Sequence, residues 1–187
     1  MDLLLYEPTD WSIVTSGGVE VDVGLSRFVF LGAAGGAFYV RQGGGAVQRL
    51  PFIAGVGGVG LSVSAGGIIT VSLSLPCQPG GGWTIYRNRL RRGSLTLSDF
   101  TGGCHCVSHV LAVGFSGSLT LAFFGIPYWA RVLAGPLSAT LPAAALSANA
   151  AGILWGTAET SSAGYSASLL SGIVAFTSAA APGETGS

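Results

Sequence analysis

Residues 101–130 contain no Asp, Glu, Lys or Arg, and this uncharged stretch constrains the fold more than any other feature of the chain. It is long enough for a transmembrane helix, which needs about 20 predominantly apolar residues. However, His105, His109 and the small residues in its middle weaken insertion into lipid, and a buried helix fits the same pattern. The segment therefore needs an apolar environment, which lipid or a protein core can supply.

The rest of the chain is also short of charge. Hydrophobic residues make up 49% of the sequence and charged residues 9%, where an average soluble domain has roughly 25% charged residues. Ser, Thr, Gly and Ala must therefore cover much of the surface, and such a surface suits contact with other apolar bodies. We accordingly predict a lipid membrane as partner and assembly into a homo-oligomer.

All eight basic residues are arginine, and the net charge is zero. The absence of Lys excludes Schiff-base chemistry and the Walker phosphate loop. A neutral chain has no long-range attraction to nucleic acid, so we expect no nucleic-acid partner. The one charge cluster is a candidate anion or lipid-phosphate site, because guanidinium groups pair with phosphate, although a solvated turn fits equally well. The cluster consists of Arg87, Arg89, Arg91 and Arg92.

The N-terminal residues and the cysteines bear on localisation. Residues 1–8 have no basic region and no small-residue cleavage site, so they do not predict a Sec signal peptide. Three cysteines, an odd number, do not make a disulfide framework and indicate a reducing compartment. We expect cytoplasmic synthesis and membrane association, with any export by another route.

Residues 1–97 are predicted to form a Gly-rich antiparallel β-domain. Over residues 19–26, Val and Leu alternate with acidic and small residues, which is the two-residue period of a strand with one polar face. Glycine-rich breaks separate further strands and indicate hairpins. The predicted hairpins join residues 28–31 to 37–40, 59–64 to 69–75, and 83–86 to 94–97.

Residues 98–181 are predicted to be helical, and residues 182–187 to be a flexible tail. Between Cys104 and Pro127, polar and small residues share one helical stripe, and large apolar residues lie away from it. Residues 143–156 and 164–178 are further helix candidates, low in charge and rich in Ala and Ser. The predicted fold class is therefore α+β, a β-domain followed by packed helices.

Three series of small residues spaced four apart predict close packing between these helices. Residues four apart lie on one helix face, and small side chains there let another helix approach closely, as in membrane helix pairs. A chain this rich in Gly, Ala and Ser also produces such series by chance. The series are Gly114, Ser118 and Ala122; Ala144, Ala148, Gly152 and Gly156; and Gly164, Ser168 and Gly172.

Residues 104–109, Cys-His-Cys-x-x-His, are the densest group of possible metal ligands. Zinc binds four nitrogen or sulfur donors, and Cys77 or Asp99 could complete the set. The spacing matches no C-x-x-C zinc knuckle. We therefore expect no metal and no cofactor, with zinc as an alternative.

The same residues raise the possibility of thiol chemistry. A cysteine at a helix N-terminus has its thiolate stabilised by the helix dipole, and His109 follows Cys106 by three positions. A soluble hydrolase that uses Cys104, Cys106 and His109 is thus an alternative function. Against it, Cys-His pairs usually come from separate elements, and structural side chains at a helix start explain the motif as well.

Membrane association or insertion without catalysis is the function that these features favour. The alternation of apolar and small polar residues over residues 59–75 also suits a lipid-facing barrel strand, although its arms are short. A self-assembling pore-forming toxin or a delivered effector would be specific forms of this function. The Cys/His hydrolase and a self-assembling structural subunit are the alternatives.

Overall fold

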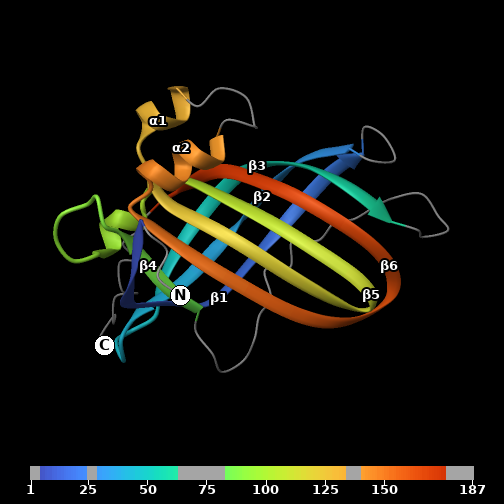
Figure 1. Cartoon of the computed structure of the whole chain (residues 1–187), viewed down its shortest axis with the longest axis horizontal. Helices are drawn as coiled ribbons and strands as arrows, with labels where there is room; N and C mark the ends of the chain where they lie inside the picture. Colours follow the sequence, from blue (N-terminus) through green and yellow to red (C-terminus); the bar gives the residue numbers. More distant parts are fainter. Residues whose placement is uncertain (1–4, 25–28, 63–82, 134–139, 176–187) are drawn as a thin grey trace, which may run out of the picture.

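The chain forms a closed antiparallel β-barrel of eight strands, with two short helices on its outside (Figure 1). The computed structural model describes residues 5–24, 29–62, 83–133 and 140–175. The strands are β1 (Tyr6–Gly24), β2 (Val29–Gln42), β3 (Gln48–Ser62), β4 (Trp83–Asn88), β5 (Gly102–Ile126) and β6 (Ala150–Val174). The two helices are α1 (Tyr128–Leu133) and α2 (Thr140–Ser147), and a 3-10 turn, η1 (Leu97–Phe100), precedes β5.

The neighbouring strands follow the order β3-β2-β1-β4-β6-β5, and an additional pairing between β3 and β6 closes the barrel. β1, β2 and β3 follow one another as antiparallel neighbours. β4 is short and pairs with β1 on one side and with the start of β6 on the other. Closure leaves no edge along the paired strands, which satisfies their backbone hydrogen bonds within the sheet.

β5 and β6 each run along the barrel, turn and come back, so each supplies two strands of the wall (Figure 1). Residues 102–113 of β5 pair with residues 163–174 of β6, and residues 115–124 pair with residues 150–159. The register shifts between Val113 and Phe115, and β6 curves around this turn. The first half of β6 reaches β4 and its second half reaches β3, so β6 joins the two sides of the barrel.

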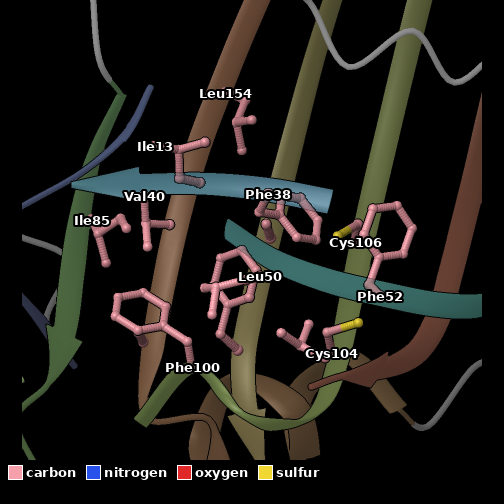
Figure 2. Close-up of a cluster of buried hydrophobic side chains, with 14 of the residues drawn as sticks. Ile13, Phe38, Val40, Leu50, Phe52, Ile85, Phe100, Cys104, Cys106 and Leu154 are labelled. Carbon is pink, nitrogen blue, oxygen red and sulfur yellow. The ribbon is translucent and has the colours of Figure 1, made fainter. Parts of the chain in front are cut away.

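The core fills the barrel near the end where β4 and η1 lie. Alternate side chains of the strands point inward, and large apolar ones such as Ile13, Phe38 and Leu50 are completely buried (Figure 2). Phe100 of η1 lies against the ring of Trp11, with 5.1 Å between ring centroids, and the Trp11 indole N–H donates to the Leu95 carbonyl. Burying each large apolar side chain contributes about 1.5–3 kcal/mol, so this cluster is the main source of stability.

The two helices cover part of the outer surface of β5. Ile126 at the end of β5 is buried with Ala130 of α1 and with Ala144 of α2 in a second, smaller cluster. Ala148, just after α2, completes that cluster, and the half-buried ring of Phe123 packs against it. The small Ala side chains let both helices approach the strand closely.

The predicted helical region is therefore wrong, and so is the α+β fold class. Residues 102–126 and 150–174 are strands, and α1 and α2 are the helices found between residues 98 and 175 in the described part of the chain. Neither has the length and apolarity needed to cross a bilayer. The physical reason for the error is that both faces of β5 are largely apolar, which removes the alternation in polarity that reveals a strand. The predicted tail, residues 182–187, lies outside the described residues.

The predictions for residues 1–97 are partly confirmed. The alternation over residues 19–26 predicts a strand, and residues 19–24 do form the end of β1, whereas residues 25–26 lie outside the described residues. The hairpin between residues 28–31 and 37–40 is wrong, because β2 continues through the glycines and pairs with β1 and β3 there. The hairpin between residues 83–86 and 94–97 is also wrong, because only its first arm is a strand. The hairpin over residues 59–75 lies mostly outside the described residues.

Candidate functional site

An apolar strip lies on the outside of β3, β5 and β6. Ile53 of β3 is 71% exposed although Phe52 and Ala54 on either side of it are buried in the core. Ile53 pairs with Ile173 of β6, which is 50% exposed. On β5, Leu119 and Leu121 are 46% and 38% exposed. We call these four residues the outer wall.

Half-buried apolar side chains connect the outer wall around the barrel. Leu121 pairs with Ile153 in the first half of β6. Val107 in the first half of β5 pairs with Leu169 in the second half of β6. All these positions face outward, because the residues next to them in sequence line the core. The wall thus extends over neighbouring strands and is not a set of isolated exposed residues, which would need no explanation.

Charge is separated from the outer wall. β5 contains no Asp, Glu, Lys or Arg, and β6 contains one such residue, Glu159, at the bend between its halves. Among the charged side chains whose exposure is described, the exposed ones lie near the starts of β1 and β3 and in the turn after β4. They are Asp10, Arg49, Arg89, Arg91 and Arg92. We call this the charged end of the barrel.

Exposed aromatic and apolar side chains also lie at the charged end, on the two helices. Tyr128 and Trp129 at the start of α1 are 79% and 60% exposed. Leu146 near the end of α2 is 58% exposed. Tyr and Trp combine an apolar ring with a polar group, and both are enriched where a membrane meets water.

The strand geometry separates the Cys and His residues that the sequence places together. Cys104 and Cys106 point into the core, beside Phe38 and Phe52 (Figure 2). His109 is exposed on the opposite face of β5. A nucleophile and its base must lie within hydrogen-bonding distance, so the structure does not bring His109 to either thiol.

Burial also makes the thiols unsuited to chemistry. The pKa of the Cys106 thiol is raised well above its ordinary value, first by burial and then by the neighbouring Cys104. The reactive form of cysteine is the thiolate, which these surroundings disfavour. Both side chains are buried in the apolar core.

No three His, Cys, Asp or Glu side chains in the described part of the chain gather into a group that could hold a metal ion. The alternation of β5 explains this for the predicted zinc ligands, because Cys104 and Cys106 face inward whereas His109 faces outward. Cys77, the proposed fourth ligand, lies outside the described residues. Asp99 instead accepts a hydrogen bond from the backbone N–H of Thr96 at the start of η1.

The four arginines of the predicted anion site have different surroundings. Arg87 forms an ion pair with Glu7 of β1, and Arg89 Nε lies 3.8 Å from the same carboxylate. Arg91 donates a hydrogen bond of 3.0 Å to the Ser147 carbonyl at the end of α2. Arg92 is exposed. Glu7 thus lies beside two of the four arginines, Arg87 and Arg89.

The small-residue series belong mostly to strands. Gly114, Ser118 and Ala122 lie in β5, and the five residues from Gly152 to Gly172 lie in β6; only Ala144 lies in a helix, with Ala148 just after it. Gly172 is still a close-packing position, because a Cβ there would collide with the Ile53 carbonyl and with Ala54. The series therefore do not form the packed helix faces that were predicted.

The outer wall was missed in the sequence, although a signal for it exists. Around Leu119, Leu121 and Phe123 every second residue is large and apolar, and the residues between them, Thr120 and Ala122, are small. This alternation is one of size and not of polarity. A search for alternating side-chain volume would have placed the strand and its outer face.

Comparisons with known proteins do not add to this geometry. No protein-family profile matches the chain, and neither a curated protein nor a solved structure matches it.

Proposed function

We propose that this protein associates with lipid bilayers through the outer wall of the barrel. The observation that carries the proposal is the exposure of Ile53, Leu119, Leu121 and Ile173 on strands that are almost free of charge. Burying apolar surface contributes about 25 cal/mol per Å², so leaving a connected apolar surface in water costs free energy that contact with lipid recovers. A closed barrel also suits lipid, because its backbone groups are paired within the sheet.

The distribution of charge and aromatic side chains supports the same proposal. The outer wall is apolar, whereas arginines and the rings of Tyr128 and Trp129 lie at the charged end. A bilayer has the same sequence of environments, a hydrocarbon interior followed by charged headgroups and an interface that favours Tyr and Trp. The charged end would then lie at the membrane surface and the outer wall against the acyl chains.

The proposal does not include a channel through a single barrel. Trp11, Phe38 and Phe124 fill the interior near the charged end, and an eight-stranded barrel is just wide enough for such side chains. A pore would need several copies of the chain. Pore formation, toxicity, delivery as an effector and the homo-oligomer stay predictions.

Flotation with neutral phosphatidylcholine vesicles tests the proposal. The test variant is Leu119→Arg/Leu121→Arg, and the matched control is Val47→Arg, because Val47 is 48% exposed but lies at the charged end. An arginine within the bilayer costs about 2–4 kcal/mol near its middle, so we expect the double variant to lose at least about thirtyfold in partitioning. The control should float like the wild type.

Circular dichroism would first establish that each variant is folded. Failure of the wild type to float, or equal flotation of the double variant, would refute the proposal. The outer wall could alternatively bind further copies of the chain, as in the structural-subunit prediction. Large particles in the absence of lipid that the arginine pair disperses would establish that alternative and overturn membrane association.

A further inference from the structure

We infer that the turn after β4 is a binding site for anionic phospholipid headgroups. The turn, residues 89–94, is exposed throughout and carries Arg89, Arg91 and Arg92 around a 67% exposed Leu90. The inference rests on the proposed membrane association and specifies which lipids the protein prefers and which end of the barrel meets the surface.

Hydrogen bonds from the backbone N–H groups of the turn hold Leu90 in its exposed position. Its N–H donates to the Asn88 side-chain oxygen over 2.9 Å, and the Arg91 N–H donates to the Asn88 carbonyl over 3.0 Å. The Arg89 N–H donates to the Leu5 carbonyl. Because each residue on this side of the turn is fixed by the barrel, the exposure of Leu90 is a property of the fold.

A second exposed leucine is tied to the same unit. The Asn88 side-chain amide, completely buried, donates to the carbonyls of Leu146 and Ala148 over 3.1 Å and 2.8 Å. Arg91 donates to the carbonyl of Ser147, between them. These hydrogen bonds hold the end of α2 against the turn. Leu146, which is 58% exposed, therefore belongs to the same surface as Leu90.

The charge of this surface is positive. Glu7 forms an ion pair with Arg87 and lies 3.8 Å from Arg89 Nε, and the ion pairs of the described residues place no carboxylate beside Arg91 or Arg92. Arg91 uses one donor for Ser147, whereas a guanidinium group has five N–H donors in a planar fork. Donors that match phosphate oxygens therefore remain on this surface.

The combination of arginines and exposed leucines favours a phospholipid over a free phosphate as the ligand of this surface. A free phosphate would use the arginines and leave Leu90 and Leu146 in water. A phospholipid offers a phosphate to the guanidinium groups and acyl chains to the leucines, so it satisfies both features. A basic residue near an anionic membrane surface contributes about 1 kcal/mol, roughly a fivefold change in affinity.

Binding to vesicles with and without phosphatidylglycerol tests this inference. The variant Arg89→Gln/Arg92→Gln removes two charges without touching Asn88 or Arg91. We expect it to lose about 25-fold in affinity for vesicles that contain phosphatidylglycerol, by the fivefold change for each arginine, and to keep its affinity for pure phosphatidylcholine. Arg49→Gln, which removes one exposed arginine of the charged end outside the turn, is the comparison variant and should lose no more than the fivefold change of a single charge.

A second variant, Leu90→Ser/Leu146→Ser, separates lipid from free phosphate. We expect it to bind both kinds of vesicle more weakly, and inorganic phosphate should not displace the wild type. Equal losses for Arg49→Gln and the double arginine variant, or full displacement by inorganic phosphate with no effect of the leucines, would overturn the inference. Flotation with pure phosphatidylcholine reports on the proposed function separately, so the failure of either idea is distinguishable.

Discussion

Phe123 and Leu121 lie two residues apart on the same outer face of β5, yet their surroundings differ. Phe123 packs against the cluster under α1 and α2 and lies 6.4 Å, between ring centroids, from Tyr6. Leu121 lies beyond the helices and is 38% exposed. The outer surface of the barrel is therefore apolar in both places, but the described part of the chain covers only one of them.

The covered part shows what covering an apolar barrel face requires. Tyr6 donates a hydrogen bond of 2.5 Å to the Ala145 carbonyl, and Asn88 and Arg91 bind the following carbonyls of α2. These carbonyls would otherwise lack partners at the end of the helix. Specific polar contacts thus hold α2 on the barrel. What covers the outer wall would be a second body with an apolar surface.

The largest expected effect distinguishes the two faces of β5. Phe124→Ala removes a completely buried ring from the core and should lower the free energy of unfolding by about 3–5 kcal/mol. Leu121→Ala, on the outer wall, should change it by less than about 0.5 kcal/mol in the absence of lipid. Urea denaturation measures both values. Similar losses for the two variants would show that the outer wall is packed within the monomer.

A smaller effect is expected where the helices are attached. Asn88→Ala removes the donor to the carbonyls of Leu146, in α2, and Ala148, just after it, and the acceptor of the Leu90 N–H. We expect a loss of about 2–3 kcal/mol in stability and faster hydrogen exchange in α2. Gln42→Ala, which removes an exposed hydrogen bond to Asp10, is the control and should cost less than about 0.5 kcal/mol. Unchanged exchange in α2 would contradict this account of the attachment.

The smallest effect depends on pH and on Tyr6. Burial raises the pKa of the Tyr6 phenol above its ordinary value, which is about 10. The unfolded chain therefore loses this proton first, so the stability that Tyr6 contributes is complete below about pH 10 and is lost as the pH rises further. The expected slope is at most about 1.4 kcal/mol per pH unit.

Urea denaturation at a series of alkaline pH values measures this slope. Tyr6→Phe should flatten it and should also cost about 1 kcal/mol at neutral pH, because the hydrogen bond to the Ala145 carbonyl is lost. Cys106 adds a similar loss of stability at alkaline pH, since burial raises the pKa of its thiol as well. An equal slope in Tyr6→Phe and the wild type would show that Tyr6 is not the group responsible.

The strands that sequence could reveal are those with one polar face. Val19, Val21 and Val23 alternate with Glu20 and Asp22, and this part of β1 was predicted correctly. β5 has apolar side chains on both faces, so its polarity does not alternate. The four-residue spacing of small residues was misleading for a related reason. Four is a multiple of the two-residue period, so residues four apart share a face in a strand as they do in a helix.

The candidate site was visible only in part. The arginines of the turn after β4 stand together in the sequence and were predicted as an anion site. Their partners Glu7 and Ser147 are distant along the chain, and no local pattern indicates them. For the outer wall, the sequence does predict membrane contact from the scarcity of charge. It does not indicate which residues face outward, because that depends on strand alternation.

The position of β6 in the barrel has a consequence for how the protein is made. β6 is the last described strand to leave the ribosome, and it pairs with β3, β4 and β5. Until β6 is made, the strand edges of β3 and β5 that it pairs with stay unpaired, and unpaired strand edges are prone to aggregation. The pairing of Ser62 with Gly164 also joins distant parts of the chain, and such contacts form slowly. We therefore expect that chaperones must protect the nascent chain from aggregation until β6 has closed the barrel.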